Sequence, residues 1–67
     1  MQMKVGDLVE LSSIGQRTLY LQGFRNKIGV VIEVRTKKEV YYPIKVKWFG
    51  AGIDTLLRSS LKFVSKA

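Results

Sequence analysis

The stretch that decides the fold of this chain is Ile44-Lys45-Val46-Lys47-Trp48, in which apolar and basic residues alternate strictly. Such alternation is typical of a β-strand with one face in a core and the other in water. A second apolar run, Gly29-Val30-Val31-Ile32-Glu33-Val34, precedes it at a spacing that suits a hairpin and is too short for a helical crossover. We therefore expect a small antiparallel β domain.

Further strands are predicted on both sides of this hairpin. We expect strands at 8–11, about 29–35, about 42–49, 53–58 and 61–64. Ser59-Ser60 predicts one 3₁₀ turn. Residues 12–29 predict a long excursion with some ordered structure, anchored by Leu19 and Leu21. Because no helix longer than a turn is expected, the sequence predicts an all-β fold with one domain over residues 1–67, a small closed or nearly closed antiparallel barrel of five strands.

The core is predicted from the inward-facing positions of these strands. Its expected members are Val9, Ile32, Val34, Ile44, Val46, Trp48 and Leu61. The facing of the second strand stays open, because Val30, Val31 and Ile32 are all apolar and a bulge would reverse the alternation. With Ile32 inside, antiparallel pairing places Glu33 opposite Lys45 or Lys47 and predicts a cross-strand ion pair.

The composition excludes several classes of function. The 67 residues include no Cys and no His, so disulfides, zinc sites of the usual kind and a thiol nucleophile are excluded, and the commonest general base is missing. The Asp and Glu residues are scattered without metal spacing or a paired-acid arrangement, so we expect no enzyme activity, metal or cofactor. No signal peptide or membrane span is recognisable, which favours the cytoplasm. So small a chain without covalent staples leaves self-association open.

The charge is strongly basic and concentrated in the middle of the chain. The net charge is +7, and residues 17–47 hold eight Lys and Arg against Glu33 and Glu39. Clustered cations of this kind favour an acidic partner such as RNA or DNA, since phosphate neutralisation releases counterions. The alternative is that the charge serves solubility alone. The candidate nucleic-acid-binding residues are Arg17, Tyr20, Phe24, Arg25, Lys27, Arg35, Lys37, Lys38, Lys45 and Lys47.

Aromatic residues occur in two places where they bear on function. On the long excursion, Tyr20 and Phe24 lie among basic residues, an arrangement suited to stacking of bases with cations on the backbone. The alternative is that Phe24 fills one end of the core. The second group comprises Tyr41, Tyr42, Trp48 and Phe49. It resembles the aromatic cages that hold methylated ammonium groups, but the alternation predicts that Trp48 is in the core instead.

Several short motifs carry a resemblance to SH3-like barrels of the Tudor and KOW kind. The opening Val5-Gly6-Asp7-Leu8-Val9 is similar to the start of many such domains, and the segment 27–34 resembles a KOW motif. Trp48-Phe49-Gly50, followed by the segment 57–64, resembles the Tudor-like finish of aromatic residue, glycine, strand, 3₁₀ turn and last strand. The resemblance implies a five-stranded SH3-like barrel. The excursion over residues 12–26 is longer than the usual KOW loop, so ribosome or polymerase contacts do not transfer directly.

The chain is also similar to small barrel proteins of tailed phages that infect marine cyanobacteria, through its opening and its Val46-Lys47-Trp48-Phe49-Gly50 strand. That resemblance implies an accessory protein in a host cytoplasm and supplies no activity. Two functional hypotheses follow. The first is a nucleic-acid-binding or nucleoprotein-associated barrel that uses charge and aromatic stacking. The second is a protein-interaction adaptor, or a small homo-oligomer, with an acidic protein partner.

Overall fold

The alternating segment forms the expected strand at the centre of an all-β structure. The computed structural model describes residues 3–35 and 43–67, and the strand β3 (Ile44–Trp48) buries its apolar residues while its lysines face outward. The other strands are β1 (Leu8–Leu11), β2 (Gly29–Val34), β4 (Gly52–Leu56) and β5 (Leu61–Ser65). The helical elements are the single turn α1 (Ser13–Gln16) and the 3₁₀ segments η1 (Leu19–Phe24) and η2 (Arg58–Ser60). The predicted all-β class, the strand positions and the 3₁₀ turn before the last strand are confirmed.

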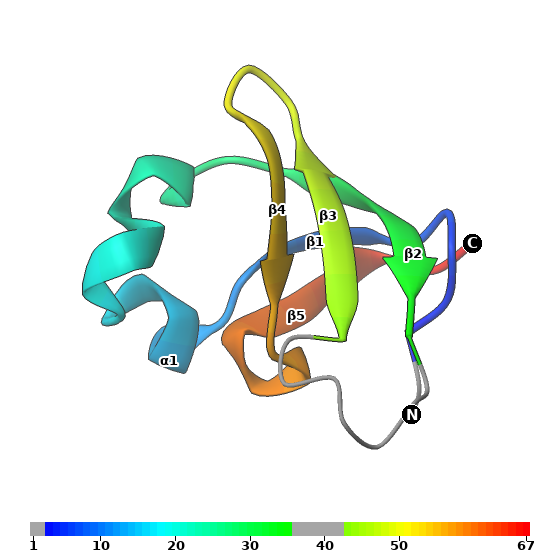
Figure 1. The fold of residues 1–67 in the computed structure, drawn as a ribbon, viewed down its shortest axis with the longest axis horizontal. Coiled ribbons are helices and arrows are strands. Elements are labelled where there is room, and N and C mark those ends of the chain that lie inside the picture. The colour runs from blue at the N-terminus through cyan, green and yellow to red at the C-terminus, as the bar shows by residue number, and fades with distance from the viewer. Residues whose placement is uncertain (1–2, 36–42) are drawn as a thin grey trace.

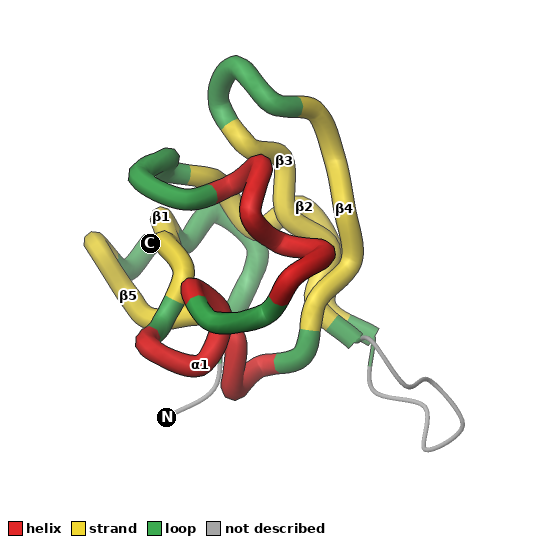
Figure 2. Tube along the Cα trace, turned by 90° about the vertical axis from the view of Figure 1, so that its left-hand side faces the viewer, coloured by secondary structure: helices red, strands yellow, loops and turns green. Residues whose placement is uncertain are grey.

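The strands form one antiparallel sheet in the order β4-β3-β2-β1-β5. The sheet is strongly curled, so that β1 and β5 lie behind β3 and β4 (Figure 1). The expectation of a closed barrel is not met, because β4 and β5 are the two edges of the sheet and do not pair with each other. The segment of α1 and η1 lies across the open side between them (Figure 2). Packing of this segment, rather than strand pairing, therefore closes the core.

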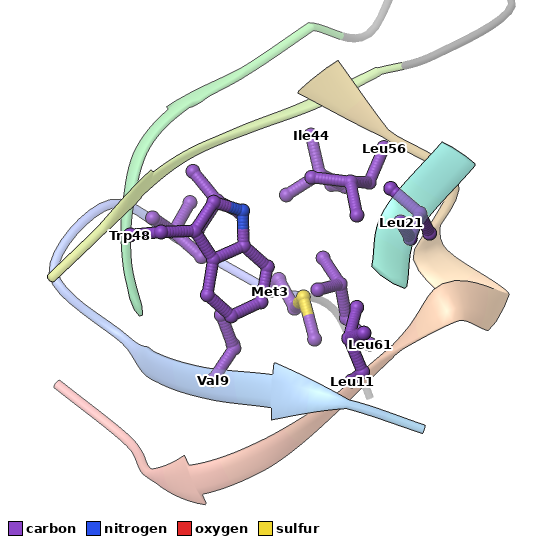
Figure 3. Packing of buried hydrophobic residues seen from close by; sticks show 10 residues of the cluster. Met3, Val9, Leu11, Leu21, Ile44, Trp48, Leu56 and Leu61 are labelled. Carbon is purple, nitrogen blue, oxygen red and sulfur yellow. The ribbon is translucent and has the colours of Figure 1, made fainter. Parts of the chain in front are cut away.

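The core is built around Trp48, which is only 1% exposed. Trp48 pairs with Gly29 across the sheet, and a Cβ at that glycine would lie 3.0 Å from Trp48 Cε3 and 2.4 Å from Val46 Cγ1. The missing side chain thus provides the space that the indole fills. Phe24 stacks on the indole of Trp48, with ring centroids 5.1 Å apart and planes inclined by 12°. Figure 3 shows Trp48 among the other buried side chains.

The facing predicted for β2 is wrong at one position. Val31 is fully buried, whereas Ile32, expected in the core, is exposed. The register shifts between Val31 and Glu33 in the pairing with β3, so Ile32 is the extra residue of a bulge. Beyond the bulge, Val34 packs against the core as expected. The remaining predicted core members, Val9, Ile44, Val46, Trp48 and Leu61, are all buried.

The excursion between β1 and β2 has one anchor rather than two. Leu21 is fully buried and enters the core from η1, as Figure 3 shows, while Leu19 is 86% exposed. The two residues are both in η1, which spans Leu19–Phe24 and is longer than the single helical turn expected. A 3₁₀ helix has three residues per turn, so residues two apart point in different directions. The prediction of Leu19 as an anchor is therefore wrong because it assumed a strand-like period.

The turn before β1 is held by a buried carboxylate. Asp7 is almost fully buried; its Oδ1 accepts a hydrogen bond from the N–H of Ala67 at 2.7 Å, and its Oδ2 accepts one from the N–H of Lys4 at 2.9 Å. Its carbonyl oxygen accepts the N–H of Val31. One residue thus joins the start of the described chain, β2 and the segment that follows β5. Hydrogen bonding from Ala67, then from Lys4, lowers the pKa of Asp7, against the opposing effect of burial.

The lowered pKa of Asp7 predicts a loss of stability in acid. A carboxylate whose pKa is lower in the folded than in the unfolded chain stabilises the fold above its unfolded pKa, about 3.9. That stability disappears as the pH falls from about 4 through the lower native value. We expect the Tm of the wild type to fall in this range and that of Asp7→Asn to be lower at pH 7 and less dependent on pH. Thermal unfolding followed by circular dichroism between pH 7 and pH 2 tests this, and parallel pH profiles for the two proteins would contradict it.

The single-turn helix α1 packs closely on η2. Ser12 caps α1, since its Oγ accepts the N–H of Gly15, and the same hydroxyl donates to the carbonyl of Ser59 at 2.6 Å. The N–H of Ser12 donates to the carbonyl of Ser60. Gly15 is buried against that carbonyl oxygen, which would lie 2.3 Å from a Cβ at this position.

Within the described ranges, no helix is long and apolar enough to cross a membrane.

Candidate nucleic-acid interface

The outer face of the sheet carries the lysines of β3. Lys47 pairs with Val30 of β2 and Ile53 of β4, so an exposed cation lies between two apolar neighbours. Lys45, which is half-buried, pairs with Glu33 and Thr55. The register predicted for Glu33 is therefore confirmed. The predicted ion pair is not found in the described residues, because Glu33 binds Arg35 instead, at 2.6 Å.

The turn that leads into β2 displays two further cations. The N–H of Lys27 donates to the carbonyl of Phe24, Arg25 has φ −64° and ψ 139°, and Asn26 has φ 61°. These angles fit a type II turn, in which asparagine is one of the few residues that tolerate the positive φ. Because Phe24 is stacked on Trp48, the turn is fixed to the core. Arg25 and Asn26 are thus held outward on a rigid base, with Lys27 half-buried at its end.

The turn between β3 and β4 lies next to this one. The N–H of Phe49 donates to the carbonyl of Ile28 at 3.0 Å, which continues the pairing of β2 and β3 by one residue. The N–H of Ala51 then bonds the carbonyl of Trp48, and Gly50 and Gly52 have φ of 81° and 88°, as a tight turn requires. The turn projects at the top of Figure 1. The prediction that this glycine-rich segment is a turn is confirmed.

These two turns and the adjoining strand residues lie at the same end of the sheet, and we call their exposed and half-buried side chains the hairpin-tip surface. Its members are Arg25, Lys27, Ile28, Lys47, Phe49 and Ile53. In the described part of the chain the ion pairs join Arg35 to Glu33 and Lys62 to Glu10, so the three cations of this surface are not neutralised by a described carboxylate. Arg25 donates a hydrogen bond to Gln22 Oε1, a neutral acceptor. The surface therefore combines unneutralised positive charge with exposed apolar side chains.

Glu33 partly neutralises the positive charge of Arg35 and Lys45. Its pKa is lowered by the hydrogen bond and the charge of Arg35, with a smaller contribution from Lys45. Because Arg35 and Lys45 share this carboxylate, their positive charge is partly cancelled. Lys47 has no such neighbour in the pairing register, since its partners are apolar. The strongest positive potential on the described outer face is therefore expected at the hairpin-tip surface.

The chain matches no protein-family model, and neither the curated proteins nor the solved structures give a match. Among the described residues, no group of three or more His, Cys, Asp or Glu side chains is placed to hold a metal ion.

The residues predicted from the sequence to bind nucleic acid divide into separate groups. Arg25 and Lys27 are on the turn before β2 and Lys47 is in β3, two segments that the hydrogen bond from Phe49 to Ile28 joins at one end of the sheet, with Lys45 farther along β3. Arg35 follows the opposite end of β2 and is bound to Glu33. The predicted residues Lys37 and Lys38 lie outside the described residues. The continuous basic face expected to join them to Lys45 and Lys47 is therefore described only in part.

The excursion carries the remaining predicted residues. Arg17 ends α1, where its Nε donates to the carbonyl of Ser13, and Tyr20 is exposed on η1. Phe24 lies against Trp48, in agreement with the alternative that it fills the core. Trp48 is buried, so it cannot line an aromatic cage at the surface. Tyr41 and Tyr42, the tyrosines of the aromatic-cage hypothesis, lie outside the described residues.

Sequence reasoning did not include Phe49, Ile28 and Ile53 in the nucleic-acid site. The alternation of β3 extended by one residue past Trp48 indicates that Phe49 points outward, so a signal for this residue was present. The association of Ile28 with Phe49 carried no local signal, because it depends on the pairing of β2 with β3.

Proposed function

We propose that this protein is a non-catalytic nucleic-acid-binding protein that contacts phosphates through the hairpin-tip surface. The observation that carries the proposal is that Arg25 and Lys27, on the turn before β2, and Lys47, in β3, lie on two segments joined by the hydrogen bond from Phe49 to Ile28, and that no described carboxylate neutralises them. Cations gathered on a rigid base suit a polyanion, because little side-chain and backbone ordering is needed at binding. The net charge of +7 adds long-range attraction.

The fold supports the same class of function without specifying it. The strand order and the 3₁₀ turn before the last strand agree with the resemblance to SH3-like barrels of the Tudor and KOW kind, in an open form. The resemblance to phage barrel proteins adds the setting of an accessory protein in a host cytoplasm and supplies no activity. Small β domains host many functions, so the fold alone does not distinguish a nucleic-acid ligand from an acidic protein.

The salt dependence of binding tests the proposal. Each phosphate contact contributes about 0.9 to the slope of log affinity on log salt for duplex DNA and about 0.7 for single strands. The double variant Arg25→Gln/Lys27→Gln should therefore reduce the slope by about 1.4 to 1.8 and weaken binding to all sequences alike. Thermal stability should hardly change, since exposed charges contribute little to folding. Fluorescence anisotropy with labelled oligonucleotides at several salt concentrations provides the measurement.

A matched control distinguishes the effect of this surface on binding from the effect of the protein's net charge. The double variant Lys4→Gln/Lys62→Gln removes the same amount of charge at exposed positions in other parts of the chain. We expect it to keep a slope close to that of the wild type. Equal effects of the two double variants would contradict the assignment of the surface. Absence of any binding at low salt would contradict nucleic acid as the ligand and favour the acidic protein partner, which a pull-down from nuclease-treated lysate should then retain.

A further inference from the structure

We propose that the hairpin-tip surface selects single-stranded over duplex nucleic acid, with Phe49 as the side chain on which a base stacks. This inference rests on the proposed function, because it names the class of ligand for the same surface. The starting observation is that Phe49 is 54% exposed at the turn between β3 and β4. An aromatic ring left in water beside unneutralised cations is the combination that single-strand binding proteins use.

The other aromatic rings among the described residues are mostly engaged by the fold. Trp48 and Phe24 stack on each other at the core. Phe63 is half-buried, with the guanidinium of Arg58 at 5.1 Å and the ammonium of Lys66 at 5.0 Å from its ring centroid. Tyr20 is exposed, but it lies on η1 and not on the hairpin-tip surface. Phe49 is thus the exposed aromatic residue that follows Lys47 on the outer face of the sheet, two residues along the chain.

The backbone of Phe49 is held in place by its neighbours. Its N–H is bonded to the carbonyl of Ile28, and it directly follows Trp48, which is anchored in the core. The glycines that follow it leave open space, since a Cβ at Gly50 or Gly52 would meet nothing within 4 Å. The Phe49 side chain is itself 54% exposed, so part of its ring is accessible to a base.

The apolar neighbours explain why a single strand fits better than a duplex. Ile28 and Ile53, which is 55% exposed, lie on the same surface as Phe49, with Lys47 paired to Ile53. A duplex presents phosphates to this surface and keeps the faces of its bases stacked inside, so the apolar side chains would stay uncovered. A single strand offers both, because its unpaired bases can cover the ring while its phosphates meet the lysines.

The experiment compares a labelled oligo(dT) with a mixed-sequence duplex of the same length, using Phe49→Ala. We expect the variant to lose about 5- to 150-fold in affinity for the single strand, the range for one lost stacked base. Its affinity for the duplex and its salt slope should stay unchanged. Phe49→Trp should keep single-strand affinity, whereas Phe49→Leu, which is apolar but has no π face, should lose most of it. Leu19→Ala, at a residue that is 86% exposed and lies outside the surface, is the control for loss of an exposed apolar side chain.

The outcomes separate this inference from the proposed function. If the wild type binds single strands and duplexes but Phe49→Ala weakens both equally or neither, the stacking inference is overturned and the phosphate-binding surface stands. If the wild type binds no nucleic acid at low salt, the proposed function itself fails. If Phe49→Ala instead abolishes self-association in sedimentation experiments and leaves nucleic-acid binding intact, the exposed ring belongs to a protein interface and the inference is wrong. Unchanged thermal melting of the variants checks their folding.

Discussion

Leu21→Ala is expected to lower the free energy of unfolding by about 2 to 5 kcal/mol, while Leu19→Ala should change it by less than about 0.5 kcal/mol. The two leucines belong to the same short 3₁₀ segment and differ in burial, with Leu21 fully buried and Leu19 86% exposed. Truncating Leu21 removes apolar contacts and leaves a cavity where η1 closes the open side of the sheet. A domain of this length has a total stability of about 3 to 10 kcal/mol, so the loss is large.

Urea denaturation of the wild type and both variants tests this pair. Should Leu21→Ala be too unstable to show a folded baseline, Leu21→Met supplies the comparison, because it keeps the volume and should cost less than about 1.5 kcal/mol. Similar midpoints for Leu19→Ala and Leu21→Ala would show that the excursion does not close the core in the way described. The pair therefore tests the feature that distinguishes this structure from a sheet closed by strand pairing.

Gly15→Ala is expected to cost about 1 to 3 kcal/mol or more, although alanine is the better helix former. A Cβ at Gly15 would lie 2.3 Å from the carbonyl oxygen of Ser60 and 3.1 Å from Leu11 Cδ2. The oxygen belongs to the backbone of η2 and accepts the N–H of Ser12, so it cannot rotate away as a side chain would. The substitution must push α1 away from η2 and weaken the packing of both on the sheet.

Gly23→Ala is the matched control, since a Cβ at that position meets nothing within 4 Å. It should be neutral or stabilise the protein by up to about 1 kcal/mol, because it lowers the conformational entropy of the unfolded chain. Thermal unfolding of the two single variants decides the matter. A Gly15→Ala protein as stable as Gly23→Ala would contradict the close approach of α1 to η2.

The distribution of positive charge over the described residues is what favours a nucleic-acid ligand. Lys45 and Arg35 share Glu33, and Lys62 is paired with Glu10, so much of the charge on the sheet is compensated locally. Arg25, Lys27 and Lys47 stay without a described carboxylate partner and lie on segments that meet at the end of the sheet where Phe49 is exposed. Charge serving solubility alone would require no such convergence.

The sequence by itself determined the features that are local along the chain. Strict alternation in residues 44–48 predicted β3 and the burial of Trp48, because a strand exposes side chains to opposite faces in turn. Glycine-rich and serine-rich segments predicted the turn at residues 50–52 and the 3₁₀ turn before β5, because glycine tolerates positive φ and serine hydrogen-bonds to nearby backbone. The concentration of basic residues between positions 17 and 47 was likewise visible without a structure.

Only the tertiary structure decided features that depend on residues distant in sequence. In β2, consecutive apolar residues carry no alternation, so the burial of Val31 rather than Ile32 was decided by a bulge in the pairing with β3. Leu21 rather than Leu19 became the anchor because η1 is a 3₁₀ helix packed over the open side of the sheet. The hairpin-tip surface exists because Phe49 pairs with Ile28, a contact between strands that local sequence does not encode. Strand register and packing are determined by the free energy of the whole core. They therefore also determine which residues lie together at the candidate site.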